Sequence, residues 1–150
     1  MIAFTVPGQP QGKGRAKIVK IGGFSRMATP AKTVAYEGLV AHAAQFAMRS
    51  TGQIEPMQCA VSVNLAIDCQ VPASWSQKKQ RQALAGEVFP TTKPDVDNVV
   101  KAIFDGLNGV VWKDDVQAVD CRIRKRYSAT PGVRVEVWAI EAPLQERIAA

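Results

Sequence analysis

Residues 61–69 alternate between large apolar and small or polar side chains, and this pattern constrains the fold more than any other segment. One side of the segment carries Val61, Val63, Leu65, Ile67 and Cys69, and the other carries Ser62, Asn64, Ala66 and Asp68. A period of two predicts a β-strand with one apolar and one polar face. The chain is therefore expected to contain a sheet, with helices covering at least one of its faces.

Three other segments have helical patterns. Apolar side chains recur at intervals of three and four residues between Val96 and Leu107, and Asp95 stands at the expected N-cap. Thr29 and Pro30 predict the start of another helix, which runs to Met48. A shorter helix is expected over residues 75–85, and its exposed side carries Lys78, Lys79 and Arg81.

Further strands are expected at residues 2–6, 116–127 and 133–140. Because Pro131 and Gly132 form a turn between the last two, these strands are predicted to pair as an antiparallel hairpin. The order of elements predicts an α+β (mixed α/β) domain with about four strands in a mixed sheet and helices packed on it. At 150 residues the chain has the usual size of one domain, which is expected to span residues 1–150.

The balance of charge limits the kind of partner. The chain has 19 Lys and Arg against 13 Asp and Glu, a net charge of +6, which favours nucleic acid or an anionic membrane. No run of 18 apolar residues or signal peptide is visible, so a cytoplasmic protein is expected. A glycine-rich flexible loop over about residues 8–28 carries five of the basic residues: Lys13, Arg15, Lys17, Lys20 and Arg26.

Acidic residues gather in one part of this basic chain, since six of its seven aspartates lie between Asp95 and Asp120. Asp95 and Asp97 open the helix at 96–107, and Lys101 follows Asp97 by one turn. Asp115 comes from the next segment and is expected to converge with them. Carboxylates from different elements suit a hard cation such as Mg²⁺, which supports phosphodiester hydrolysis.

Simpler explanations of the same residues stay open. An aspartate at an N-cap favours any helix, and Asp97 with Lys101 is an ordinary surface pair. Asp105 is expected to pair with Lys101 rather than to bind a metal. Arg122, Arg124 and Arg126 share one strand face that suits phosphate contacts or simply faces solvent. The basic loop is either a DNA-clamping arm or a mobile solvated segment.

Two longer motifs resemble a known family. The runs KPDVDNVVKAIFDGL (93–107) and VVWKDDVQAVD (110–120) are similar to the signature of RusA-type crossover junction endodeoxyribonucleases, often carried by phages and prophages. The PGQPQGKGR opening, the helix before the acidic segment and the closing strands fit more loosely. The opening departs from the PPSxNR pattern of better-known members, and the C-terminus is longer.

The resemblance implies the site and the activity. Asp95 and Asp97 match the paired family aspartates, Lys101 the lysine after them, and Asp115 the residue completing the metal site. It further implies Mg²⁺ or Mn²⁺ as cofactor, and a homodimer that resolves Holliday junctions by paired symmetric nicks in DNA recombination and repair. The expected location is the cytoplasm of a bacterium or phage-infected host. Expected DNA contacts are Lys13, Arg15, Lys17, Lys20, Arg26, Lys78, Lys79, Arg122, Arg124 and Arg126.

Three alternatives follow from the same residues. A non-catalytic basic DNA-binding module would bind DNA in a salt-sensitive way without cutting it. A nuclease for other branched nucleic acids would keep the metal site but prefer another substrate shape. A small structural phage protein would require the acidic cluster to be accidental.

Overall fold

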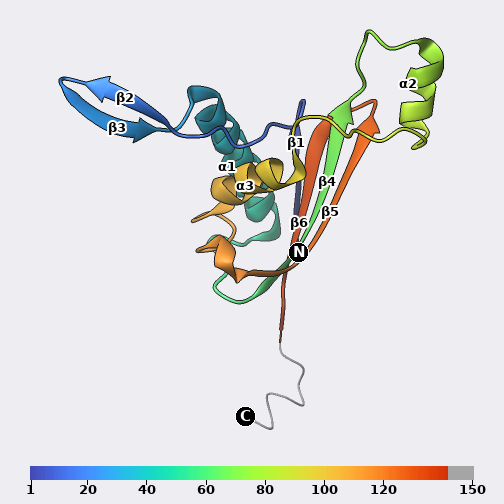
Figure 1. Ribbon diagram of the computed structural model, residues 1–150. Helices are drawn as coiled ribbons and strands as arrows, with labels where there is room; N and C mark the ends of the chain where they lie inside the picture. Colours follow the sequence, from blue (N-terminus) through green and yellow to red (C-terminus); the bar gives the residue numbers. More distant parts are fainter. Residues whose placement is uncertain (142–150) are drawn as a thin grey trace.

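The computed structural model describes residues 1–141, which form a four-stranded sheet, three α-helices and a separate two-stranded hairpin (Figure 1). The sheet has the order β1-β6-β4-β5. Its strands are β1 (Ile2–Pro7), β4 (Val61–Gln70), β5 (Ala118–Ser128) and β6 (Gly132–Ala139). β4 pairs parallel with β5 and antiparallel with β6, and β6 pairs antiparallel with β1. The predicted α+β class with a mixed four-stranded sheet is confirmed.

The apolar face of β4 is the centre of the core. The five apolar side chains predicted from the alternation are all at most 3% exposed. Helices α1 (Ala31–Thr51) and α3 (Val96–Leu107) lie together on the same side of the sheet, and within residues 1–141 the opposite face is left open (Figure 1). The alternation along β4 therefore reflects a sheet that helices cover on its apolar face only.

The predicted pairing of the last two strands is wrong, because β4 lies between β5 and β6. Leu65 of β4 stands opposite Ile123 on one side and Val135 on the other. The short link at residues 129–131 crosses the end of β4, a gap of two strand spacings or about 10 Å, which three residues can span. A turn signal sets the direction of the chain but not which strands become neighbours.

The predicted flexible loop at 8–28 is also corrected, since its second half is a hairpin of β2 (Lys17–Ile21) and β3 (Phe24–Ala28). Gly22 and Gly23 join the strands with φ values of 57° and 84°, which suit a type I′ turn. The hairpin projects away from the rest of the molecule (Figure 1).

The first half of that loop is fixed against two helices. The backbone N–H of Lys13 donates to the carbonyl oxygen of Asn98 on α3 at 2.9 Å. The N–H of Gly14 donates to Oγ1 of Thr33 on α1 at 3.0 Å. A Cβ on Gly14 would lie 2.7 Å from that oxygen, so only glycine allows this close approach.

The remaining helix, α2 (Gln77–Leu84), and the β2–β3 hairpin project on opposite sides of the molecule (Figure 1). Its N-cap is Ser76, whose side chain accepts a hydrogen bond from the N–H of Lys79. Trp75, just before it, packs edge-on against Tyr127 of β5, with ring centroids 5.3 Å apart. No helix within residues 1–141 is long and apolar enough to cross a bilayer.

α1 and α3 meet at a glycine. A Cβ on Gly106 of α3 would lie 2.9 Å from both Cβ and Cγ1 of Val40 and 3.1 Å from the carbonyl oxygen of Glu37. The two backbones can approach this closely only because position 106 has no side chain. This contact sets how α3 sits on α1, and α3 carries most of the candidate site described below.

We expect Gly106→Ala to lower the free energy of unfolding by about 1–3 kcal/mol, because its methyl group overpacks the α1–α3 contact. Gly38→Ala is the matched control, since a Cβ at Gly38 of α1 meets no atom within 4 Å. It should raise stability by up to about 1 kcal/mol through helix propensity. Urea denaturation followed by circular dichroism measures both, and equal effects would contradict the close contact.

Candidate active site

The N-terminal turn of α3 presents Asp95 and Asp97 in different directions. Asp97 lies in the first turn of the helix, whereas Asp95 has an extended backbone, and the two side chains line different pockets. Asp95 is the N-cap residue, yet its side chain makes no capping hydrogen bond. The hydrogen bond that the capping interpretation requires is therefore not made by Asp95.

Asp97 faces a groove between α3 and β5 that measures about 730 Å³. Lys101 and Asp115 line the same groove, as the sequence predicted. Apolar side chains form the remaining walls: Val96, Val100, Phe104 and Ile123. Two carboxylates and an ammonium thus share one open depression.

Trp112 returns the chain toward α3 and so places Asp115. Its indole is fully buried and packs edge-on against Phe104, with ring centroids 5.1 Å apart. The indole Nε1 donates to Oδ1 of Asn108 at 2.7 Å, and Nδ2 of Asn108 lies 3.4 Å from Oδ2 of Asp115. Asn108 therefore joins the buried indole to the exposed carboxylate.

The two aspartates of the Asp114–Asp115 pair have different environments. Asp114 caps the 3-10 turn η1 (Asp115–Gln117): its side chain accepts from the N–H of Val116, and Gln117 Oε1 accepts from the N–H of Asp114. Asp115 contributes its carboxylate to the groove instead. Asp115, and not Asp114, is therefore the aspartate of this pair that shares the groove with Asp97 and Lys101.

Four charged residues form a network beside the groove. Asp105 accepts from Nζ of Lys101 and from Nζ of Lys13, both at 3.0 Å, and Lys13 also pairs with Glu37 of α1. Burial alone would raise the pKa of the Asp105 carboxyl, but the hydrogen bonds from Lys101 and Lys13 lower it below its ordinary value. The hydrogen bond to Asp105, with a smaller effect of Asp115, raises the pKa of Lys101.

Asp95 lies outside the groove. It lines a neighbouring pocket of about 550 Å³ together with Pro94, Asn98 and the fixed loop at residues 9–14. Within residues 1–141, no three acidic, histidine or cysteine side chains stand close enough together to hold a metal ion. The structure thus brings Asp97 and Asp115 together in the groove and places Asp95 in the adjacent pocket.

The basic residues predicted to contact DNA fall into separate groups. Lys13 is engaged in the charge network, whereas Arg15, Lys17, Lys20 and Arg26 lie on or beside the β2–β3 hairpin. Lys78 and Lys79 are exposed on α2, and Nζ of Lys79 lies 3.9 Å from the ring centroid of Trp75.

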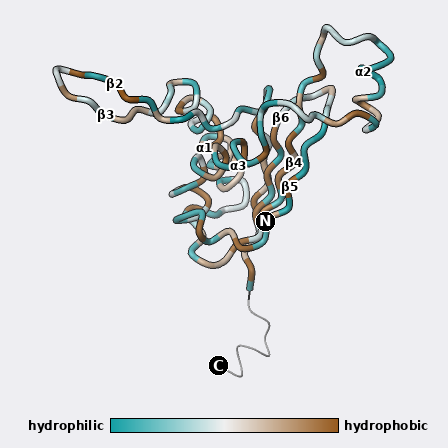
Figure 2. Tube along the Cα trace, in the orientation of Figure 1, coloured by the Kyte–Doolittle hydropathy of each residue, from teal (hydrophilic) through white to brown (hydrophobic). Residues whose placement is uncertain are grey.

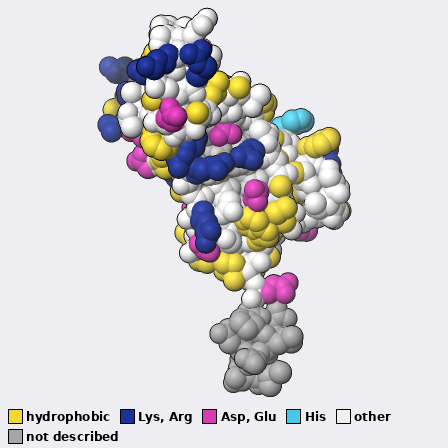
Figure 3. All heavy atoms as spheres, turned by 90° about the vertical axis from the view of Figure 1, so that its right-hand side faces the viewer, with side chains coloured by type: hydrophobic (Ala, Val, Ile, Leu, Met, Phe, Trp, Pro, Cys, Tyr) yellow, Lys and Arg dark blue, Asp and Glu magenta, His cyan; other side chains and the backbone are white. Residues whose placement is uncertain are grey.

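The arginines of β5 mostly face away from the groove. Arg122 stands beside Asn64 on the open face of the sheet, whereas Ile123 lines the groove on the helix side. Figure 3 shows Lys and Arg side chains at the upper end of this open face and in a row across its middle. Arg126 packs over the ring of Phe89 at 4.9 Å. DNA in the groove would therefore have to pass the edge of β5 to contact the arginine row.

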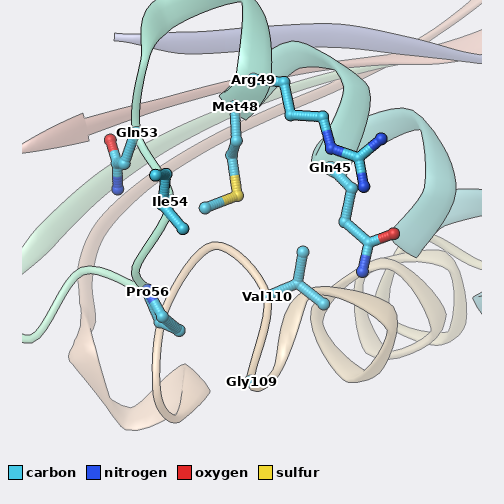
Figure 4. A pocket seen from close by; sticks show the side chains of 8 residues that line it. All are labelled: Gln45, Met48, Arg49, Gln53, Ile54, Pro56, Gly109 and Val110. Carbon is cyan, nitrogen blue, oxygen red and sulfur yellow. The ribbon is translucent and has the colours of Figure 1, made fainter.

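Another pocket, of about 420 Å³, lies at the C-terminal end of α1 (Figure 4). Its walls include Met48, Ile54 and Val110, and Arg49 reaches over it. None of the predicted site residues lines it.

The sequence matches the family described as Endodeoxyribonuclease RusA over residues 7–138. The chain belongs to the RusA family. It is also 38% identical over 141 residues to the uncharacterized protein YqaN of Bacillus subtilis strain 168, an alignment that covers 94% of this chain and 98% of YqaN. The match to the RusA family includes α3, the groove and strands β4 and β5, most of β6, and only the last residue of β1.

Sequence reasoning missed the residues that support this site of a RusA-family protein. Asn108 directly follows the helix at 96–107 in the sequence, so its link to Asp115 gives no separate signal. Lys13 was assigned to the DNA-binding loop, although its ammonium pairs with Glu37 and Asp105. Spacing along one helix predicts the pair of Lys101 and Asp105, but a pairing across three elements requires the fold.

We expect Asp105→Asn to lower the free energy of unfolding by about 1 kcal/mol at pH 7, because Lys13 and Lys101 lose their shared acceptor. Since the pKa of Asp105 is lowered by folding, its contribution is present above its ordinary pKa and is lost as the pH falls through the folded value. The difference in the free energy of unfolding between Asp105→Asn and the wild type should therefore become smaller as the pH falls from about 5 to about 3.

Urea denaturation over this pH range measures that difference. Asp120→Asn is the control, because Asp120 is exposed on β5 and should change stability by less than about 0.5 kcal/mol. A difference for Asp105→Asn that is constant with pH would contradict the role of its charge.

Proposed function

We propose that this protein is a metal-dependent endodeoxyribonuclease that resolves four-way DNA junctions by hydrolysing phosphodiester bonds. The observation that supports this most is the groove in which Asp97, Lys101 and Asp115 meet, in a chain that belongs to the RusA family. The groove is open and polar at its acidic end, as a site for a phosphate backbone requires.

The donor set fits a hard divalent cation. Mg²⁺ usually takes only one or two carboxylates from the protein and keeps waters or substrate phosphates as its other ligands. Asp97 and Asp115 would hold the ion, and Asp95 is available at the adjacent edge of the helix. A cation bound there, Mg²⁺ or Mn²⁺, would lower the pKa of a water and polarise the scissile phosphate.

Lys101 has a separate role in this proposal. Its Nζ is fixed by Asp105 at 3.0 Å, and its side chain is 59% exposed toward the groove, so its ammonium can contact a non-bridging phosphate oxygen. The raised pKa keeps this group charged throughout the physiological range. Lys101 would thereby orient the DNA backbone, while Asp97 and Asp115 would hold the cation on the side of the attacking water.

Paired nicks across a junction call for two sites related by symmetry. We propose a homodimer, since a two-fold dimer matches the two-fold symmetry of a four-way junction. Light scattering should then give twice the 16.2 kDa of one chain. Its expected place of action is the cytoplasm of a bacterial or phage-infected cell, where recombining or replicating DNA forms branches.

Cleavage of a synthetic four-way junction beside a linear duplex of the same sequence tests the proposal. We expect paired nicks in the junction alone, in the presence of Mg²⁺ and not of a chelator. Metal-dependent cutting of both substrates, or of flaps and other branches in preference, would leave a nuclease but remove the junction specificity. Salt-sensitive binding without cutting would favour the non-catalytic DNA-binding module.

Asp97→Asn and Asp115→Asn should each reduce cleavage by more than about a hundredfold. Each change keeps the shape of the side chain but replaces a charged metal ligand with a neutral amide. Junction binding in chelator should be unchanged or tighter, since each change removes repulsion between a carboxylate and phosphate. Gel nicking and fluorescence anisotropy measure the two effects. Asp120→Asn, which lies outside the groove, is the control and should cleave normally; loss of cleavage in all three variants would contradict the site.

A further inference from the structure

The β2–β3 hairpin, residues 17–28, exposes apolar side chains on both of its faces. Ile18 is 70% exposed, Ile21 53%, Phe24 80% and Met27 63%. Figure 2 shows apolar stretches on both strands, well away from the core. Because exposed apolar residues gathered on one projection mark an interaction site, this hairpin, called the arm below, is expected to contact a partner.

The charge around the arm identifies the chemistry of that partner. No acidic residue precedes Glu37 in the sequence, whereas Arg15, Lys17, Lys20 and Arg26 all lie in or next to the arm. A purely basic projection is complementary to a polyanion such as DNA. A second copy of this chain is a poor occupant by the same criterion, since it carries a net charge of +6 itself.

The base of the arm is fixed next to the candidate active site. The preceding loop is hydrogen-bonded to α3 through Asn98 and to α1 through Thr33. In Figure 1 the arm and the basic helix α2 project on opposite sides of the N-terminal end of α3, which carries Asp95 and Asp97. DNA lying in the groove beside α3 would therefore extend past the arm.

The tip of the arm is apolar and aromatic. Ile21 and Phe24 are cross-strand neighbours that flank the turn, and Gly22 and Gly23 between them have no side chains. The phenyl ring is therefore the leading bulky group of the arm. Lys17 and Arg26 follow it on the same face of the hairpin, and Lys20 lies on the other face.

We propose that Phe24 stacks on a base exposed at the branch point of the DNA, while Lys17, Lys20 and Arg26 contact the flanking phosphates. This inference rests on the proposed nuclease function and adds to it a residue that recognises branched substrates. Bases within a linear duplex are stacked on each other, whereas a branch exposes base faces on which an aromatic ring can stack. The arm therefore favours branched over linear DNA.

The test compares binding of fluorescein-labelled four-way junction and linear duplex by anisotropy, with chelator present so that neither is cut. Phe24→Ala should weaken junction binding about tenfold and duplex binding less than about twofold. Phe24→Trp should retain junction binding because it keeps an aromatic ring. Met27→Ala, an apolar truncation on the other face of the arm, is the matched control and should change neither by more than about twofold.

Folding is not expected to interfere, because Phe24 is 80% exposed and its truncation should leave the melting temperature unchanged. Equal weakening for junction and duplex, or no weakening at all, would overturn the inference. A smaller oligomer for Phe24→Ala by light scattering would also overturn it and would identify a second copy as the occupant. If the wild type nicks junctions and Phe24→Ala binds them normally, the proposed nuclease function is retained and only the role of the arm is excluded. A wild type that neither prefers nor cuts junctions would contradict both proposals.

Discussion

The pairing of β4 on both of its edges is the constraint from which the rest of the molecule follows. Among the described residues, 1–141, β5 is attached to the sheet only through β4, and β6 joins β4 to β1. The five buried side chains of β4 also provide the surface on which the helical layer packs. Because β5 runs parallel to β4, the chain must return along the sheet before β5 begins. That return carries Trp112 and Asp115 past α3.

The chemistry of the groove then depends on few local interactions. Asp97 opens the groove from the first turn of α3, and the buried Trp112 with Asn108 places Asp115 beside Lys101. Asp105 and Glu37 pair with Lys101 and Lys13, and within residues 1–141 neither ammonium group forms an ion pair with Asp97 or Asp115. Two uncompensated carboxylates in a basic protein attract a cation, which in turn can bring a phosphate to them.

The sequence predicted those features that depend on local periodicity. Alternation identified β4 and its buried face, and spacing of three and four residues identified α3 with Asp97 and Lys101 on one side. It could not predict that β4 would separate β5 from β6, because a three-residue turn does not determine which strand lies next to which. The arm was taken for a loop since both of its faces are exposed, so its strands lack the burial pattern that normally reveals them. The sequence also could not show that Asp95 lines a pocket beside the groove, because the direction of an N-cap side chain depends on the loop packed against it.

The charged side chains of β5 affect whether two copies of this protein can pair edge to edge. Within residues 1–141, β5 is paired on one edge only, which leaves its other row of backbone groups open to a strand from another molecule. Charged side chains occupy much of its length, namely Asp120, Arg122, Arg124, Lys125 and Arg126. Repulsion between like edges opposes such pairing and therefore protects against aggregation. The arginines of β5 therefore oppose aggregation even when no DNA is bound. Replacing them with apolar residues would leave a strand edge that pairs readily with another molecule.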